Sequence, residues 1–567
     1  MNAELLLRHF NRISDAPDSV QRLRQLILDL AVRGRLVEAN SSDECASVLL
    51  NRIQKQRARM VEKGEIKKQE TLPVDAGDEP FPLPTHWVWT RLGTIADWGA
   101  GSTPARGNLD LFGGGITWLK SGELNDNRQL AGSEENISEL ALTKGSFRLN
   151  QPGDVLLAMY GATIGKVAIL AEPAVTNQAV CGCTPLPGVS NLYLFNFLLS
   201  QRSQFQAASE GGAQPNISKI KILGFAFPLP PLAEQHRIVA KVDELMALCD
   251  RLEAAQRERE NRRDQLAAST HHHLNNGADA EALRSHAQFF IGHLPRLTTR
   301  PNQVKQFRQT ILNLAVRGKL VLQDQNDEPA TALMQRISTE KLRLNRLGLI
   351  RAEKALREID PALFFELPQG WKWANWDSVA LKIGDIDHKM PETVTNGIPF
   401  ISPRDFLPGN GIDFEGAKRV SREDFLRLSL KVKASPGDLI YPRYGTIGEN
   451  RLVTEERDFL VSYSCAVVKV MWGFVDPKFQ YIFSVSSLCK EQAKAAENKT
   501  TQANVGIKSI QEFAFPLPPL AEQHRIVAKV DELMALCDQL ESRLTTAQTE
   551  AARLLESVLH HALQTPA

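Results

Sequence analysis

Residues Phe225–Asp250 read FAFPLPPLAEQHRIVAKVDELMALCD, and residues Phe513–Asp538 repeat this stretch letter for letter, 288 positions later (513 − 225). Chance and secondary-structure propensity do not produce an identity of this length. The chain therefore contains two copies of one unit, and its fold has to be interpreted as an internal repeat.

The repeated stretch predicts a short strand followed by a helix. Phe225–Phe227 is an apolar run typical of a last strand. Pro228, Pro230 and Pro231 are expected to end the pairing of that strand, because proline donates no ladder hydrogen bond. The same prolines suit the start of a helix, whose first N–H groups have no partner anyway. Glu234 lies in the expected first turn, where a negative charge suits the helix dipole.

Within the expected helix, apolar residues recur at alternating spacings of four and three, which is the pattern of a coiled-coil seam. The seam positions are Ile238, Val242, Leu245, Cys249 and Leu252 in the first copy, and Ile526, Val530, Leu533, Cys537 and Leu540 in the second. An ordinary amphipathic helix on a globular core would show the same spacing. Two identical seams in one chain favour the interpretation that the two helices pair with each other.

Other elements repeat 284 positions apart (304 − 20). Val20–Val37 and Val304–Val321 predict amphipathic helices that end in the same Leu-Ala-Val-Arg-Gly sequence. Phe81–Trp89 and Phe365–Trp373 each carry Leu-Pro followed by two tryptophans. We interpret these as the opening strand of a globular domain, with the tryptophans as packing anchors.

Between these landmarks, at about 94–224 and 378–512, the halves diverge. Short apolar runs alternate there with Gly, Pro and Asn turns and are followed by helical patterns, so each half predicts a mixed α/β domain. The fold class is α+β with an internal pseudo-two-fold repeat. The predicted boundaries are a helical region at 1–80, a first domain at 81–230, a long helix at 231–275, a linker at 276–301, a second helical region at 302–363, a second domain at 364–518 and a second long helix at 519–567.

Length and composition limit the class of protein. A chain of 567 residues is too long for one domain, and its apolar fraction of 43% is ordinary for a globular protein. Its seven scattered cysteines suggest reduced thiols in a cytoplasmic protein. No window approaches the ~18 apolar residues of a membrane span. The net charge of +1 means that an anionic partner would have to be held by local patches.

Common catalytic motifs are missing. Gly161–Val167 resembles a phosphate loop, but its glycines are too close and Val167 replaces the hydroxyl that would hold magnesium. Cys181 and Cys183 have a one-residue spacer, which does not suit zinc. The triplet His271–His273 could bind a metal, but a solvated helix end is favoured because no Cys or carboxylate lies at ligand spacing. The sequence has no HExxH and no GxSxG. These absences argue against catalysis by this chain itself.

Together, the doubled PLPPLAEQHRIVAKVDELMA element, the LPxxWxW elements, Pro-Gly-Asp at 152–154 and 436–438, and the glycine turn at 160–165 closely resemble specificity subunits of Type I restriction-modification enzymes. The resemblance covers about Val20 to Leu559. It implies two target-recognition domains, each reading one half of a split DNA site. It also implies that the two long helices lie antiparallel and set the gap between these domains.

The resemblance also implies the partners and cofactors. Double-stranded DNA would be bound by this chain, with two methyltransferase subunits and motor-nuclease subunits docked on it. S-adenosylmethionine, ATP and magnesium would belong to those partners, with no cofactor or metal on this chain. A helix of ~35–40 residues spans roughly 50–60 Å, so domains at its ends could reach major grooves about one DNA turn, ~34 Å, apart.

Candidate DNA contacts follow from the same resemblance. Phosphate contacts would place each domain, and loop side chains would read base edges, with Arg and Lys suited to guanine and Asn and Gln to adenine. The candidates are Thr103, Lys120, Ser121, Tyr160, Lys166, Asn177 and Gln178 in the first domain, and Arg404, Arg443 and Tyr444 in the second. The second domain lacks the Gly-Ser-Thr-Pro element and has Tyr463-Ser464 near the Asn-Gln position. A role as surface charge or turn residue stays open for each candidate. A second set could equally cap turns: Gln214, Asn216, Gln502 and Asn504.

Two other classes of protein remain open from the sequence alone. One is a self-sufficient DNA methyltransferase or nuclease with an unrecognised site. The other is a tandem-repeat scaffold that does not contact DNA. Turnover by the pure chain would favour the first, and a failure to shift DNA with or without a methyltransferase partner would favour the second.

Overall fold

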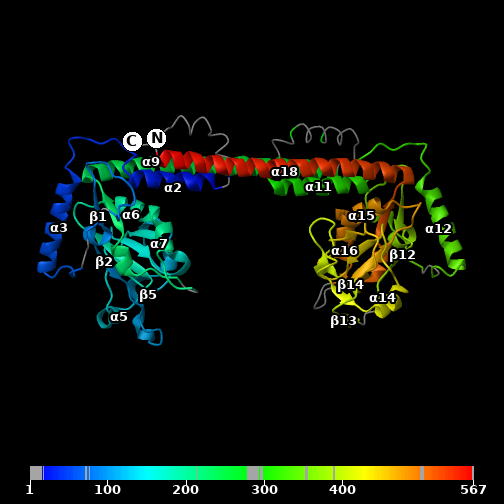
Figure 1. Ribbon diagram of the computed structural model, residues 1–567, viewed down its shortest axis with the longest axis horizontal. Coiled ribbons are helices and arrows are strands. Elements are labelled where there is room, and N and C mark those ends of the chain that lie inside the picture. The colour runs from blue at the N-terminus through cyan, green and yellow to red at the C-terminus, as the bar shows by residue number, and fades with distance from the viewer. Residues whose placement is uncertain are drawn as a thin grey trace. The chain divides into compact units, whose positions relative to one another are not determined.

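The computed structural model describes residues 16, 18–69, 73–75, 77–212, 215–276, 286, 293, 298–351, 355–386, 390–498 and 504–564. Most of the predicted linker at 276–301, together with Gln214 and Gln502, lies outside this range. The chain forms two compact units (Figure 1). Unit 1 comprises Met1–Arg259 and Gln548–Ala567, and unit 2 comprises Glu260–Ala547.

Unit 1 has a five-stranded sheet in the order β2-β9-β6-β7-β4, a three-stranded sheet in the order β5-β3-β8, and the pair β1-β10. Its strands are β1 (Val88–Arg91), β2 (Ala96–Ala100), β3 (Phe112–Leu119), β4 (Asn127–Leu130), β5 (Asn136–Ile137), β6 (Val155–Ala158), β7 (Val167–Leu170), β8 (Val175–Thr176), β9 (Val180–Pro185) and β10 (Ala226–Leu229). Its helices are α2 (Ser19–Val32), α3 (Ala46–Glu62), α4 (Leu92–Ile95), η1 (Leu109–Leu111), η2 (Ser121–Glu123), α5 (Glu139–Lys144), η3 (Gly161–Thr163), α6 (Asn191–Ser200), α7 (Arg202–Ala207), α8 (Lys219–Leu223) and the start of α9 (Leu232–Asn276).

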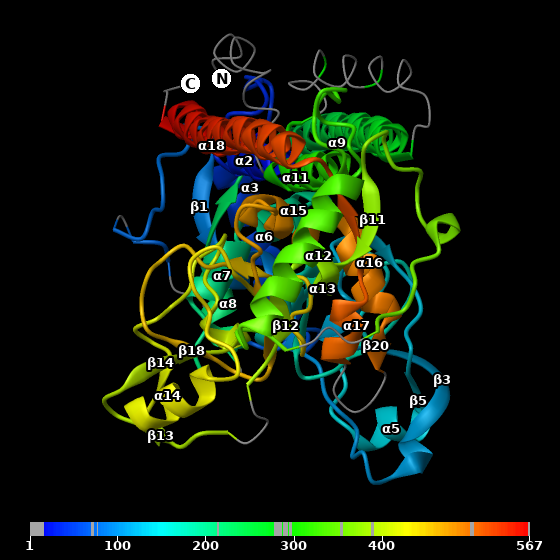
Figure 2. The same ribbon diagram turned by 90° about the vertical axis from the view of Figure 1, so that its right-hand side faces the viewer.

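Unit 2 has two four-stranded sheets, in the orders β12-β19-β16-β17 and β13-β15-β14-β18, and the pairs β11-β22 and β20-β21. Its strands are β11 (Lys372–Asn375), β12 (Lys382–Gly384), β13 (Thr393–Val394), β14 (Ile398–Ile401), β15 (Lys418–Val420), β16 (Leu439–Pro442), β17 (Arg451–Leu452), β18 (Leu460–Val461), β19 (Cys465–Lys469), β20 (Glu497–Asn498), β21 (Asn504–Val505) and β22 (Ala514–Leu517). Its helices are α11 (Pro301–Val316), α12 (Ala330–Arg346), η4 (Pro361–Leu363), α13 (Trp376–Val379), η5 (Pro403–Asp405), α14 (Arg422–Ser429), α15 (Pro477–Val485), α16 (Ser487–Ala495), α17 (Ile507–Gln511) and the start of α18 (Leu520–Gln564). Figure 2 shows α12 alongside α13 in this unit.

The two units share one frame. In each, the opening tryptophan strand pairs antiparallel with the repeated last strand, so that Trp89 lies opposite Pro228 and Trp373 opposite Pro516. The expectation that Pro228 ends the strand is wrong, because β10 runs on to Leu229. The pair β1-β10 has only two strands, so a residue without an N–H can face the side that carries no ladder.

In each unit, a glycine with left-handed backbone conformation packs the Leu-Ala-Val-Arg-Gly element against the Leu-Pro-x-x-Trp element. Gly34 (φ +68°) follows α2, and a Cβ built on it would meet the Pro84 ring at 2.5 Å. Gly318 (φ +64°) follows α11 and would meet Pro368 at 2.4 Å. Only glycine accepts both the backbone conformation and the close approach. The Leu-Ala-Val-Arg-Gly and Leu-Pro-x-x-Trp elements therefore repeat together because they pack on each other.

The predicted packing anchors are buried. Trp87 keeps 6% of its surface exposed and Trp371 keeps 8%. Each lies in the main apolar core of its unit, where Trp87 meets Tyr193 edge to face at 6.4 Å and Trp371 meets Phe479 at 6.3 Å. The repeat thus uses equivalent aromatic contacts to build two equivalent cores.

Helices α9 and α18 each contain 45 residues, about 67 Å. Each unit holds the start of one long helix and the end of the other. In unit 1, one face of α2 joins the main core through Ile27 and Ala31, while Leu26 and Leu30 pack with Ala562 of α18. In unit 2, two polar contacts join the end of α9 to α11 and its N-cap: Arg300 with Asp264 at 2.6 Å, and Thr310 with His271 at 2.9 Å.

The predicted seam residues are buried or half-buried within their own unit. Ile238, Val242 and Cys249 belong to the same core as α2, with Leu245 and Leu252 packed against it. The second set, Ile526, Val530, Leu533, Cys537 and Leu540, has the same position against the core that includes α11. The two similar α/β domains, the long helices and the internal repeat are confirmed. The pairing of the two seams with each other stays a prediction.

Candidate nucleic-acid interface

In unit 1, two pairs of predicted contact residues lie at the same edge of a sheet, directly after parallel strands: Lys120-Ser121 and Asn177-Gln178. Strands β3 and β8 run parallel, with Leu119 opposite Thr176. The Asn177 N–H donates to the Leu119 carbonyl at 2.9 Å, which continues the ladder past the end of β8. Parallel strands end on the same side of a sheet, so Lys120-Ser121 and Asn177-Gln178 follow these strands side by side.

A loop carrying Thr103 closes onto this edge. The Ser102 N–H donates to the Thr176 carbonyl at 2.9 Å, and Trp118 Nε1 donates back to the Ser102 carbonyl at 3.0 Å. The Thr103 hydroxyl then donates to the Gln178 side-chain oxygen. A Cβ on Gly101 would lie 2.2 Å from the Thr176 carbonyl oxygen, so glycine is required for this close approach.

Tyr160 and Lys166 flank the η3 turn between β6 and β7 and complete the group. Lys166 Nζ donates to Asn125 Oδ1 at 2.9 Å, just beyond η2. The Met159 N–H donates to the Ala179 carbonyl at 2.8 Å, which ties the turn to the segment after Gln178. The seven predicted residues of the first domain therefore gather on one edge. We call this edge the first contact edge: Thr103, Lys120, Ser121, Tyr160, Lys166, Asn177 and Gln178.

Two residues beside the first contact edge, Arg106 and Glu135, were not predicted from the sequence. The Glu135 carboxylate pairs with Lys120 at 2.7 Å and with Arg106 at 3.1 Å. The hydrogen bond from Lys120, more than the nearby Arg106 charge, lowers the pKa of Glu135. The Arg106 guanidinium lies over the Phe112 and Trp118 rings, 5.5 and 5.4 Å from their centroids. Arg106 follows the Gly-Ser-Thr-Pro element by two residues, which was the available signal, whereas nothing local marks Glu135.

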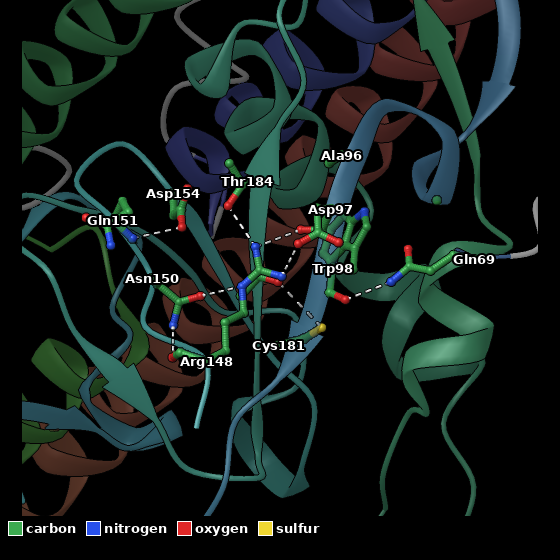
Figure 3. A network of polar contacts seen from close by, with 12 residues as sticks. Gln69, Ala96, Asp97, Trp98, Arg148, Asn150, Gln151, Asp154, Cys181 and Thr184 are labelled. Carbon is green, nitrogen blue, oxygen red and sulfur yellow. Dashed lines mark hydrogen bonds and ion pairs between the residues drawn. The ribbon is translucent and has the colours of Figure 1, made fainter. Parts of the chain in front are cut away.

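A polar network around Arg148 (Figure 3) fixes the position of β8, the strand that leads to Asn177. Arg148 donates to the Asp97 carboxylate of β2 at 2.6 Å, to Thr184 Oγ1 of β9 at 2.7 Å and to Asn150 Oδ1 at 3.1 Å. Asn150, almost fully buried, donates in turn to the Ala174 carbonyl at 3.2 Å, directly before β8. The five-stranded sheet thereby holds the start of β8 in place, and this two-residue strand leads directly to Asn177 and Gln178 of the first contact edge.

Unit 2 builds the same edge with other side chains. Strands β14 and β18 are parallel, and the Ser462 N–H donates to the Ile401 carbonyl at 2.8 Å, as Asn177 does to Leu119. Ser462 and Tyr463 therefore take the positions of Asn177 and Gln178, one residue earlier than the sequence predicted. Arg404 lies on η5 with its side chain exposed, and within the described part of the chain it has no hydrogen bond or ion pair.

Arg443 has an interior position, unlike Arg404. Its guanidinium is nearly buried and forms an ion pair with Asp385, while Nε donates to the Val505 carbonyl at 3.0 Å. It also lies 5.6 Å from the centroid of the Tyr444 ring, which contacts the Tyr463 ring edge to face at 6.4 Å. Arg443 thus supports the two tyrosines of the edge from within, and its own contact with DNA stays a prediction.

Two predicted turn residues take equivalent places. Asn216 pairs with Tyr160, and Asn504 pairs with Tyr444, each in an isolated antiparallel backbone bridge. Both asparagines therefore hold the turn of a contact edge through the backbone. Within the ranges that the structure covers, no group of three or more His, Cys, Asp or Glu is placed to hold a metal ion. The same ranges contain no helix long and apolar enough to cross a membrane.

These features define a class: a tandem recognition protein with two similar α/β modules, each presenting a polar loop edge and leading into a long helix. A sequence profile described as the Type I restriction modification DNA specificity domain matches this chain twice, at residues 84–260 and 368–548. Because the two matches cover more than half of the chain, the protein belongs to this family of specificity subunits. The family resemblance seen in the sequence is confirmed.

Individual relatives agree with this assignment. The chain is 29% identical to the Type I restriction enzyme EcoAI specificity subunit of Escherichia coli, over 96% of this chain and 94% of the relative. It is 28% identical to the EcoEI specificity subunit of the same species, with the same coverage. Among solved structures, the HsdS subunit from Thermoanaerobacter tengcongensis aligns over 86% of this chain and 99% of its own, with 18% identity and a TM-score of 0.44.

Proposed function

We propose that this chain reads a two-part, asymmetric DNA sequence, with one domain for each half-site. The observation that carries the proposal is the contrast between frame and edge. The two domains share their backbone hydrogen bonds at the edge, yet Asn177-Gln178 of one domain is Ser462-Tyr463 in the other. A shared frame with different loop side chains is what two readers of different base sequences require, because base edges are distinguished by side-chain donors and acceptors.

We further propose that the chemistry belongs to partner subunits. In this account two methyltransferase subunits bind S-adenosylmethionine, and motor-nuclease subunits use ATP and magnesium, while this chain positions them on DNA in the cytoplasm. The proposal is supported by the names of the relatives, which are specificity subunits of restriction enzymes.

The test compares the pure chain with the chain co-expressed with the methyltransferase subunit of its host system. We expect co-purification, a sequence-dependent gel shift, and transfer of labelled methyl groups to DNA only when the partner is present. Methyl transfer or cleavage by the pure chain would instead favour a self-sufficient enzyme. Co-purification without any DNA shift would favour a protein scaffold.

A further inference from the structure

Helix α3 is a rigid part of unit 1, held by the face that it turns inward. Ala46, Leu49 and Ile53 on this face are fully buried. Arg57 is buried as well, and its guanidinium donates to the Thr94 and Ala96 carbonyls at 3.2 and 3.1 Å. It thereby satisfies carbonyls at the end of the short helix α4, where a cation also suits the helix dipole. Any side chain on the outer face of α3 therefore has a fixed base.

The outer face of α3 is basic from Arg52 to the C-cap residue Lys63. Arg52, Lys55, Arg59 and Lys63 follow at spacings of three, four and four, are all exposed, and line an open groove of about 760 Å³. Their positions cover about 16 Å of helix axis. Arg52 is paired with Glu44 at 2.9 Å, and Lys63 lies 3.8 Å from Glu65.

The two central cations of this face are available for a partner. Within the described part of the chain, the side chains of Lys55 and Arg59 form no hydrogen bond and no ion pair. Two neighbouring cations without counter-charges repel each other, so an anion bound between them would be stabilised. We call Arg52, Lys55, Arg59 and Lys63 the basic face of α3.

The equivalent helix of unit 2 does not have this property. On α12, Arg336 is paired with Glu328 at 2.7 Å and Arg343 with Glu340 at 2.6 Å. The position of Lys63 is taken by Leu347, which is 59% exposed. The buried anchoring positions are the same in both helices, and both carry an arginine at the positions of Arg52 and Arg59. The two lysines and the unpaired central cations are features of α3 and not of the repeat.

The chemistry of this face favours a nucleic acid over a protein as its occupant. The centres of protein interfaces are enriched in aromatic residues and depleted in lysine. Among the described residues, no aromatic side chain lines this groove, and its apolar lining is Val48 together with the half-buried Met60. Duplex DNA carries a negative charge every ~1.7 Å of its axis, so a basic stretch of ~16 Å faces several phosphates. We propose that the basic face of α3 binds the phosphate backbone of DNA, outside the bases read by the first contact edge. This proposal rests on the proposed function.

The experiment measures binding of the full chain, in complex with its methyltransferase subunits, to a fluorescein-labelled 40-base-pair duplex at several salt concentrations. We expect the variant Lys55→Gln/Arg59→Gln to reduce the slope of log affinity against log salt by about 1.8, because each lost phosphate contact contributes ~0.9. Affinity at 0.1 M salt should fall by roughly tenfold or more. The matched control, Arg336→Gln/Arg343→Gln, removes the same charge from α12 and should leave the slope within ~0.5 of the parent.

Four outcomes decide the proposal. A reduced slope in the α3 variant alone, with an unchanged methylated sequence, supports it. An unchanged slope overturns it, as does an equal reduction in the α12 control, which would indicate a general charge effect. Loss of the methyltransferase subunit from the complex would assign the face to a protein partner. Failure of the proposed function is distinguishable, because the parent complex itself would then show no preference among DNA sequences.

Discussion

Replacing Arg443 by methionine tests whether this guanidinium is a buried support of the second domain. The strand registers place Met159 and Ala100 of unit 1 where unit 2 has Arg443 and Asp385. The ion pair is largely shielded, with side-chain exposures of 7% and 17%. Removing one partner of a buried pair costs about 3–5 kcal/mol. Because Asp385 keeps some contact with solvent, we expect about 3 kcal/mol for Arg443→Met.

The double variant Asp385→Ala/Arg443→Met installs the two side chains that unit 1 has at the equivalent positions. It removes the carboxylate together with the guanidinium, so we expect stability to return to within about 1 kcal/mol of the parent. The double variant should therefore be about 2 kcal/mol more stable than Arg443→Met alone.

Hydrogen exchange with mass spectrometry measures this in the full chain. Peptides covering β16 and β19 report the opening of unit 2, and those covering β6 and β9 of unit 1 serve as the internal control. A loss of 3 kcal/mol corresponds to roughly 100- to 200-fold faster exchange in unit 2 for the single variant, with most of it restored in the double variant. Equal protection in all three proteins would refute the structural role. Intact protection with an altered half-site would instead identify Arg443 as a base contact.

The remaining predictions concern the contact edge, one thiol and one buried carboxyl group. Gly101→Ala should lower sequence-specific DNA binding at least tenfold because its Cβ collides with backbone oxygens, whereas Gly107→Ala, which meets nothing within 4 Å, should bind like the parent in the same gel shift. Cys45 is exposed while the other six cysteines are buried, and hydrogen bonding from Ser47 lowers the pKa of the Cys45 thiol. Intact-mass analysis should therefore find one maleimide adduct per native chain, formed faster than with an ordinary thiol at pH 7. Two or more adducts would contradict the burial of the other six cysteines. Burial raises the pKa of Glu522 above its ordinary 4.5, so the folded form keeps the proton at pH values where the unfolded form has lost it. The free energy of unfolding therefore falls as the pH rises from the unfolded pKa through the folded one. Glu522→Gln should flatten this pH dependence in denaturant titrations of unit 2, and an unchanged slope would contradict the prediction.

The frame could be predicted from sequence because its signals are local and repeated. Three features each depend on residues within one turn or one strand: the helix that ends just before Gly34, the buried Trp87 and the long helix after Pro231. Their recurrence in the second half excluded chance. Lys120 and Asn177 were predicted as candidate contacts through the family resemblance, and the parallel pairing of β3 with β8 is what shows that they lie together.

Other features depend on residues that are distant in sequence, so no local pattern could show them. Arg443 looks like a surface cation until Asp385, 58 residues earlier, is seen beside it. Arg57 looks like one of several helix cations, yet it alone turns inward to the carbonyls after Gly93. A proline usually ends a strand. Pro228 can lie inside β10 because β10 has a single partner strand. Glu135 became visible only through the two cations that its carboxylate joins.

The most direct measurement is base-resolution mapping of DNA methylation in a host whose chain carries residues 94–224 of a relative with a different target. If two independent modules read two half-sites, one half of the methylated sequence changes to that of the donor, while the other half and the spacing between them stay as before. A change in both halves, or methylation of the original sequence, would contradict the assignment of one half-site to each domain.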